Sequence, residues 1–263
     1  MKVFIDPGHG GSEKANRGPT GYIEADGVLD IALKLKPLLQ RHFDVKLSRE
    51  TDTTVPLYTR TDMANAWGAD LFISIHTNAA SSREAQGIEI FHSKMGEWGG
   101  RFATEASQLA AYVLKFLVKE TGRKSRGIKT RLVGTPGFPI QGMDYYAVLR
   151  RARCPAIIVE AGFHTNPEEE ALLKTPEFRQ KVAEAIAKGT LYYAGLYKEE
   201  EKQECPFKDV PPNHWAIEAI KYVKENEFMK GFPDGTFHPD APLTRAQMAS
   251  IFYTVLSKLL QKP

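Results

Sequence analysis

The sequence contains few cysteines and no long apolar run. Its 263 residues include two cysteines, Cys154 and Cys205, which lie far apart and match no metal-binding or redox spacing. We therefore expect two free thiols rather than a disulfide or a cysteine-ligated metal. A membrane-spanning helix needs about 20 predominantly apolar residues. No stretch of the sequence approaches that length, so we expect no membrane span.

An excess of charge of one sign is also missing. Lys and Arg number 35 and Asp and Glu number 32, which gives a formal net charge of +3. The basic residues are scattered, so the sequence predicts no nucleic-acid partner and at most a loose attraction to anionic polymers. With 42% hydrophobic and 25% charged residues the composition is typical of a globular protein, and the length suits one full domain and a smaller one.

Strands and helices alternate over residues 1–197. Short apolar runs predict strands at residues 2–6, 45–48, 71–76, 87–92 and 156–160, and amphipathic stretches predict helices at residues 26–43, 57–67, 102–121 and 178–196. This alternation predicts an α/β domain with a mainly parallel, twisted sheet and helices on both faces.

Ligand-type side chains follow several of these strands. His9 comes after the first strand in the glycine-rich stretch DPGHGG, His76 ends LFISIH, Glu160 ends AIIVE, and Glu24 lies in a predicted loop at the same edge. Ligands of such sheets gather beyond the carboxyl ends of the strands. Two histidines and a carboxylate are a known ligand set of catalytic zinc, and a further glutamate can accept a proton from water.

Each of these residues also has a purely structural interpretation. His76 alone would be a hydrogen-bonded core histidine, Glu160 an ion-pairing carboxylate and Glu24 a solvated loop residue. His92 and His164 also lie near strand ends, and spacing alone does not exclude them as ligands. A phosphate-binding loop is less favoured, because DPGHGG lacks the Lys-Ser/Thr of a P-loop and the GxGxxG spacing of a dinucleotide site.

Several longer motifs occur in order between residues 2 and 197. They are DPGHGG, Glu24 in its loop, LSRETD, RTDMANAWGADLFISIHTNAA, GIEIFH and VLRRARCPAIIVEAGFHTNPEEEALL. Together they resemble the zinc-dependent N-acetylmuramoyl-L-alanine amidases of the Amidase_3 type. The resemblance implies metal ligands at His9, Glu24 and His76, a catalytic glutamate at Glu160, and a structural or substrate-lining role for Asn78.

The implied activity is peptidoglycan hydrolysis. The family cuts the amide bond between the lactyl group of N-acetylmuramic acid and the L-alanine of the stem peptide, which implies one zinc ion per chain and a general base at Glu160. Two alternatives stay open: a non-catalytic wall-binding protein, and a zinc peptidase that cuts within the stem peptide. The intact set of proposed ligands argues against the first, and product analysis would separate the second.

The composition changes after Tyr197. Residues 198–206 contain the charged run KEEEKQE, which predicts a linker. Residues 207–263 contain two amphipathic stretches, at 215–226 and 244–260, on either side of the turn-rich GFPDGTFHPD. They predict a helical module small enough to need partners for stability.

Motifs in this segment resemble an S-layer homology module: FKDV, HWA, GF, DGTF and LTRA. Such modules bind pyruvylated secondary polymers of Gram-positive walls, commonly as three copies. One copy is present here, and Gln247 stands where the family usually has Glu. The resemblance implies binding to anionic wall polymers, with Trp215 and Arg245 as candidate contacts, since a guanidinium suits anionic sugar substituents.

The start of the sequence as given bears on where the protein acts. Met1 and Lys2 run directly into the first predicted strand, without the charged, apolar and cleavage regions of a signal peptide. We therefore expect a protein that is made in the cytoplasm and acts at the cell wall. A holin, cell lysis or non-classical export would release it, as for a phage or prophage endolysin or a bacterial autolysin.

Overall fold

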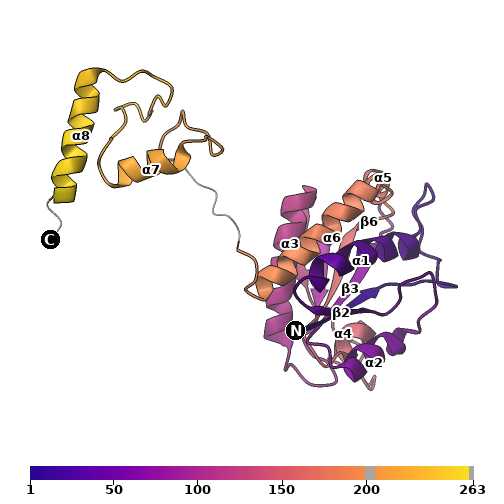
Figure 1. Ribbon diagram of the computed structural model, residues 1–263. Coiled ribbons are helices and arrows are strands. Elements are labelled where there is room, and N and C mark those ends of the chain that lie inside the picture. The colour runs from indigo at the N-terminus through magenta and orange to yellow at the C-terminus, as the bar shows by residue number, and fades with distance from the viewer. Residues whose placement is uncertain (199–204, 261–263) are drawn as a thin grey trace. The chain divides into compact units, whose positions relative to one another are not determined.

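The computed structural model describes residues 1–198 and 205–260, in two compact units (Figure 1). The first unit comprises Met1–Lys198 and the second comprises Glu199–Pro263. Most of the predicted linker, residues 199–204, lies outside the described residues. Among the helices that are described, none combines the length and apolar character needed to cross a membrane.

The first unit is a six-stranded sheet with helices on both faces, as the alternation of strands and helices predicts. The strands, in the order in which they lie side by side, are β2 (Asp44–Leu47), β1 (Lys2–Pro7), β3 (Leu71–Asn78), β6 (Ala156–Phe163), β4 (Ile88–His92) and β5 (Ser125–Lys129). The helices are α1 (Glu24–Gln40), α2 (Leu57–Trp67), α3 (Ala103–Thr121), α4 (Ala147–Arg151), α5 (Pro167–Leu173) and α6 (Pro176–Tyr193).

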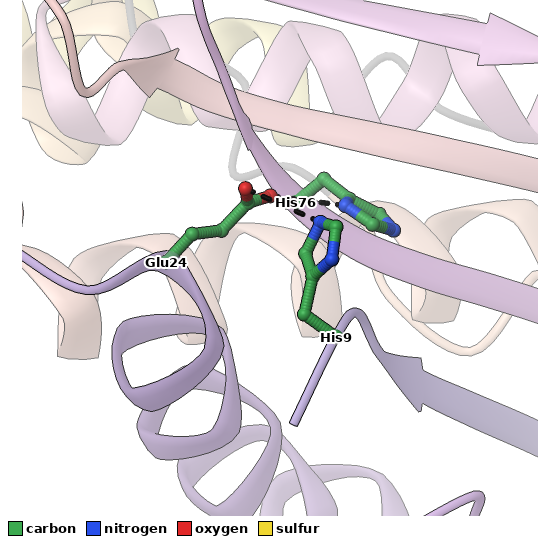
Figure 2. Close-up of side chains that lie close together, drawn as sticks. All are labelled: His9, Glu24 and His76. Carbon is green, nitrogen blue, oxygen red and sulfur yellow. Dashed lines mark hydrogen bonds and ion pairs between the residues drawn. The ribbon is translucent and has the colours of Figure 1, made fainter. Parts of the chain in front are cut away.

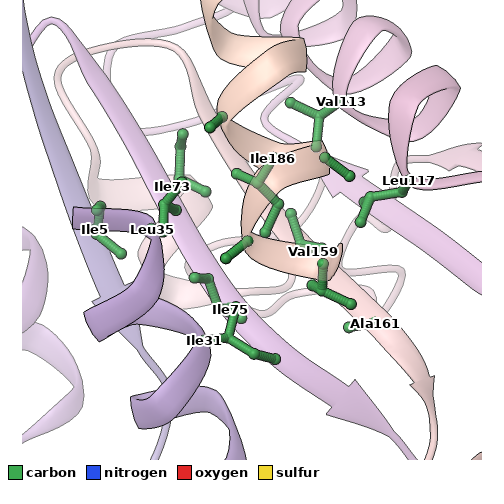
Figure 3. Close-up of a cluster of buried hydrophobic side chains, with 14 of the residues drawn as sticks. Ile5, Ile31, Leu35, Ile73, Ile75, Val113, Leu117, Val159, Ala161 and Ile186 are labelled. Atoms are coloured by element: carbon green, nitrogen blue, oxygen red, sulfur yellow. The ribbon is translucent and has the colours of Figure 1, made fainter. Parts of the chain in front are cut away.

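Alternation along the strands divides the core between the two faces. Side chains such as Ile5, Ile73 and Val159 pack with α1, α3 and α6 in the larger cluster, part of which Figure 3 shows. Their neighbours Phe4, Phe72 and Ile158 point to the other face, which α2 and α4 cover. The sheet is therefore buried on both sides, as is usual for parallel strands.

Strand β4 is antiparallel to β6, whereas the other pairings in the sheet are parallel. The connection from β3 to β4 contains only residues 79–87 and no helix. A parallel crossover needs a dozen or more residues, so a chain this short returns in the opposite direction. The carboxyl end of β4 therefore lies at the opposite edge of the sheet from the carboxyl ends of β3 and β6.

The second unit contains α7 (Ile217–Glu225) and α8 (Arg245–Leu260) around a small apolar cluster. Four buried side chains form this cluster: Phe207, Val210, Ile217 and Ile220. The turn-rich segment is tied to it through Asp209, whose carboxylate accepts hydrogen bonds from the backbone N–H groups of Phe237 and His238 at 2.8 and 2.7 Å.

Helix α8 begins with a reciprocal cap. Thr244 Oγ1 accepts a hydrogen bond from the Gln247 N–H at 3.2 Å, and Gln247 Oε1 accepts one from the Thr244 N–H at 2.8 Å. Glutamine serves this capping box as well as glutamate does. Gln247 therefore keeps the local structure although it departs from the usual residue.

Both cysteines are free thiols, as the spacing predicts. Cys154 is buried beneath α4, and burial raises the pKa of its thiol to about 12. It is accordingly an unreactive core residue.

Candidate active site

The loop after β1 brings His9 to the edge of the sheet. A Cβ atom at Gly8 would overlap the imidazole ring of His76, so glycine is required where the two strands deliver their histidines. His9 itself has a φ of 55°, in the left-handed region that costs an ordinary residue about 1–2 kcal/mol. This strain persists because the surrounding structure fixes the loop.

Two buried arginines fix that loop. Arg60 donates to Asp6 Oδ1 at 2.7 Å and to the carbonyl oxygens of Pro7 and His9 at 2.8 and 2.9 Å. Arg49 donates to the carbonyl oxygen of Gly8 at 2.7 Å. Guanidinium groups thus bind the carbonyl oxygens of Pro7, Gly8 and His9, and together they fix the position of His9.

Glu24 is the first residue of α1, so the predicted loop position is wrong. No apolar periodicity marks residues 24 and 25 as helical, which explains the error. A carboxylate is favoured at a helix N-terminus by the helix dipole. Its side chain is almost completely buried, and Oε1 accepts a hydrogen bond from the Thr77 N–H at 2.9 Å. Asn16 Nδ2 donates to Oε2 at 2.8 Å.

His9, Glu24 and His76 converge at this edge (Figure 2). Glu24 Oε2 lies 3.3 Å from His9 Nε2, and Glu24 Oε1 lies 3.0 Å from His76 Nδ1. The two imidazole rings are nearly perpendicular, with centroids 5.1 Å apart. Burial by itself would raise the pKa of Glu24, but the hydrogen bonds from both histidines lower it well below its usual value. The hydrogen bond to Glu24 in turn raises the pKa of His9.

These three side chains fit a zinc site. One ligand atom from each lies within 4.8 Å of the others. Zinc-ligand bonds of about 2.0–2.2 Å in a tetrahedron place ligand atoms about 3.4 Å apart, which is close to the two separations above. Two imidazoles and one carboxylate also match the donors of catalytic zinc, which keeps a fourth position open.

Glu160 stands next to this cluster. Strand register pairs it with His76 on β3, so both side chains project from the same face of the sheet. Its Oε2 atom is buried and has no hydrogen-bond partner among the described residues. Burial, Glu24 and Glu89 all raise the pKa of Glu160 well above its usual value. An unpaired carboxyl oxygen with this tendency is suited to accepting a proton.

The other two candidate histidines, His92 and His164, do not belong to this ligand cluster. His92 ends β4 and pairs with Ile157 near the start of β6, at the opposite edge of the sheet. His164 is buried, and its Nδ1 is 3.0 Å from Thr77 Oγ1. Of the described residues, the acidic and imidazole groups close enough to share a metal ion are His9, Glu24 and His76.

Comparison with known proteins identifies the family. Residues 3–192 match the model of the N-acetylmuramoyl-L-alanine amidase family. The chain belongs to the N-acetylmuramoyl-L-alanine amidase family. Residues 206–249 match the S-layer homology domain, so this amidase carries both kinds of domain.

Similar proteins include bacterial and phage members of the family. The N-acetylmuramoyl-L-alanine amidase AmiA of Escherichia coli K12 is 34% identical over 217 residues, which cover 73% of this chain and 75% of AmiA. The endolysin of Bacillus phage SPP1 is 31% identical over 235 residues, covering 89% of this chain and 78% of the endolysin. A crystal structure of an N-acetylmuramoyl-L-alanine amidase from Clostridium difficile 630 matches with a TM-score of 0.64 and 32% identity, over 75% of this chain and 98% of that one.

Several residues of the amidase site carry no recognisable signal in the sequence. Arg49 and Arg60 lie within quoted motifs, but a charged residue in isolation is more often solvated than buried. Asn16 donates to Glu24 and lies 3.1 Å from His9 Nε2, although it stands in an irregular loop. The arginine contacts join residues far apart in sequence, and the Asn16 contacts depend on the path of an irregular loop, so only the folded chain reveals them.

Asn78 lies at the end of β3, and its Nδ2 donates to Glu89 Oε1 at 2.8 Å. In the second unit, Trp215 is 90% exposed and stacks on His214 with centroids 5.9 Å apart. Arg245 is exposed at the first turn of α8. No hydrogen bond or ring contact joins Trp215 to Arg245 within the described part of the unit, so their joint role stays a prediction.

Proposed function

We propose that this amidase hydrolyses the bond between the lactyl carbonyl of N-acetylmuramic acid and L-alanine, with zinc held by His9, Glu24 and His76. The observation that supports this most is the meeting of two imidazoles and a buried carboxylate beside Glu160, whose Oε2 has no hydrogen-bond partner in the described part of the chain. When bound, zinc supplies Lewis-acid chemistry that polarises the scissile carbonyl and lowers the pKa of water.

Glu160 moves the proton in this proposal. Its unpaired Oε2 accepts a proton from the attacking water and returns it to the departing alanine nitrogen, because an amide anion is too poor a leaving group. Glu24 is ionised before the metal binds, because hydrogen bonds from the two histidines lower its pKa, and a bound zinc ion would favour the same ionised form. Arg49 and Arg60, together the arginine clamp, hold the His9 loop in place while the proton moves.

The proposal extends to the wall itself. Peptidoglycan is the substrate, and the S-layer homology module binds anionic secondary polymers of the wall through Trp215 and Arg245. The proposed domain limits are residues 1–197 for catalysis, 198–206 for the linker and 207–263 for the wall-binding module. Both bacterial amidases and a phage endolysin occur among the relatives, so cell-wall turnover and phage lysis are the two settings to consider.

Incubation of purified wall with the protein tests the reaction. The expected products carry the free amino group of L-alanine, no new reducing sugar ends appear, and a chelator stops the reaction. Mass spectrometry identifies the new termini. Amino groups of a residue within the stem peptide would instead support the peptidase, and retention on wall without any new terminus would support the non-catalytic binding protein.

A further inference from the structure

A row of charged side chains extends from the proposed catalytic residues toward the edge strand β5. Glu160 on β6 pairs with His76 on one side and with Glu89 on β4 on the other. Residues paired across neighbouring strands project from the same face. Glu89 therefore shares the face of the proposed metal site.

Glu89 is buried, and it gathers three side chains. Its Oε2 accepts from Arg126 Nε and from Lys129 Nζ, both at 2.6 Å, and its Oε1 accepts from Asn78 Nδ2 at 2.8 Å. Burial by itself would raise the pKa of Glu89, but Lys129 and Arg126 lower it below its usual value. Two cations share one carboxylate, so the cluster of Glu89, Arg126 and Lys129 carries more positive than negative charge.

A bulge in β5 explains why both cations reach the same carboxylate. Residues three positions apart in a regular strand project from opposite faces. Here Ile88 pairs with Ser125 and Ile90 pairs with Ile128, so β5 contains one residue more than β4 over this interval. Gly127 lies in this interval with a φ of 85°, which favours glycine. The extra residue turns Arg126 and Lys129 to one face, as bulges beside functional sites do.

Protection of an edge strand is the simpler explanation for basic residues on β5. Lysines on edge strands prevent association with other sheets, and the exposed Lys124 suits that role. It does not explain a buried carboxylate that fixes two cations beside Glu160. The side chain of Arg126 also lies 4.7 Å from the ring centroid of Phe163. The side chains of Arg126 and Lys129 remain 34% and 36% exposed, so a ligand can reach them.

We propose that Arg126 and Lys129 bind a free carboxylate of the stem peptide, and that Glu89 positions them. This inference rests on the proposed amidase function. The charged ends of both side chains lie 2.6 Å from Glu89 Oε2, and Glu89 pairs with Glu160 on the neighbouring strand. Adjacent strands lie about 4.8 Å apart, so the two cations are about 7 Å from Glu160. An extended peptide covers about 3.4 Å per residue, which places the carboxylate about two residues beyond the scissile amide.

The test compares two soluble N-acetylmuramoyl tetrapeptides. In one, all carboxyl groups of the stem are free, and in the other all are primary amides. A charge-assisted hydrogen bond to a carboxylate is lost in the amide, so wild-type kcat/KM is expected to fall by about 10- to 100-fold, mainly through KM. The Arg126→Gln/Lys129→Gln variant is expected to cleave both substrates at similar rates.

Lys124→Gln is the matched control. It removes one exposed cation next to β5 and is expected to keep the preference for the acidic substrate. Glu89→Gln is expected to weaken the preference without loss of bound zinc, which a purely structural role would not predict. If the double variant does not fold, Lys129→Gln alone, which leaves Arg126 on Glu89, is expected to reduce the preference.

Equal cleavage of both substrates by the wild-type protein would overturn the carboxylate subsite and leave the amidase function intact. An unchanged preference in a folded double variant would also overturn it. Failure to release the L-alanine amino group from either substrate would instead contradict the proposed function. The comparison of the two substrates on the wild-type protein requires no variant, so it gives a result even if the variants do not fold.

Discussion

At the scale of single residues, Glu24 connects the proposed metal ligands to one another. Each of its oxygens faces a different imidazole, and the Thr77 N–H and Asn16 Nδ2 occupy further acceptor positions. A buried carboxylate is costly unless it is paired. The two histidines provide that pairing when no metal is bound, and a bound cation would strengthen it.

Replacing His76 with alanine tests the ligand set. His76→Ala is expected to lose zinc and activity together, because two side chains remain where catalytic zinc needs three. His92→Ala is the control and is expected to keep both, since His92 lies at the opposite edge of the sheet. Metal content is measured after dialysis, and full zinc retention in His76→Ala would contradict the assignment.

Replacing Glu160 with glutamine tests proton transfer. Glu160→Gln keeps nearly the same shape, so it is expected to retain the fold and the zinc while kcat falls by about 10²- to 10⁴-fold. If Glu160 only orients a ligand, zinc affinity would instead fall by about 10- to 100-fold and excess zinc would restore activity. Measurement of both quantities on one variant distinguishes these roles.

The same variant gives a pH-dependent stability difference in zinc-free protein. Burial, Glu24 and Glu89 raise the pKa of Glu160, so the folded state holds a proton that the unfolded chain releases above about pH 4.3. Wild-type stability therefore decreases as pH rises from that value through the folded-state pKa. Glu160→Gln avoids this loss and is expected to have a higher Tm at about pH 8 but not at about pH 4. A difference that does not vary with pH would contradict the raised pKa.

At the scale of elements, α2 supports the loop after β1 through Arg60. Arg60 and Asp6 form a buried ion pair at 2.7 Å. Arg60→Met leaves the Asp6 carboxylate and the His9 carbonyl without this partner, and is expected to cost about 3–5 kcal/mol of unfolding free energy. Zinc affinity is expected to fall as well, because the strained His9 conformation loses its support. Chemical denaturation of zinc-free protein and metal titration measure the two effects.

Arg151→Met is the control for this substitution. Arg151 pairs with the exposed Asp62 at 2.9 Å, and an ion pair of this kind contributes about 1 kcal/mol or less. Zinc affinity is expected to stay unchanged, since Arg151 lies before β6 and away from the metal cluster. Equal losses of stability in the two variants would contradict a larger stabilising contribution from the buried Arg60–Asp6 ion pair than from an exposed one.

The sequence predicts those helices and strands that have a strong local signal, such as an apolar run or a helical periodicity. The apolar runs of β1, β3 and β6 locate the edge where His9, His76 and Glu160 meet, because strand ends follow from alternation and sheet topology. The short β5, α4 and α5 lack strong periodicity, so the sequence does not predict them. The antiparallel direction of β4 depends on the length of a connection rather than on its composition, so the location of His92 could not be read from strand ends alone.

The carboxylate subsite illustrates the same limit. Arg126 and Lys129 are three residues apart, a spacing that assigns them to opposite faces of a regular strand. The bulge at Gly127 reverses this assignment, and it exists only in the pairing of β5 with β4. Glu89 likewise resembles a solvated polar residue of an edge strand until β6 is placed beside it.

At the scale of the whole molecule, the proposed function assigns catalysis to the first unit and wall attachment to the second. The proposed ligands, Glu160 and the arginine clamp all lie within Met1–Lys198, which has a core on both faces of its sheet. The second unit has four buried apolar side chains in its cluster and none of the grouped metal ligands found among the described residues. We therefore expect the first unit to fold and react by itself.

Deletion of residues 205–263 tests this division. The shortened protein is expected to cleave soluble muropeptides at the wild-type rate, because every proposed catalytic group remains. Its retention on intact Gram-positive walls in a pull-down is expected to fall, most on walls rich in anionic secondary polymers. High salt is expected to reproduce the loss in the full-length protein by screening the contact of Arg245 with those polymers.

Trp215→Ala and Arg245→Gln in the full-length protein are expected to weaken retention while turnover of soluble fragments stays constant. Loss of activity on soluble fragments after truncation would make the second unit a structural part of the enzyme, and unchanged retention would locate the wall-binding surface on the first unit.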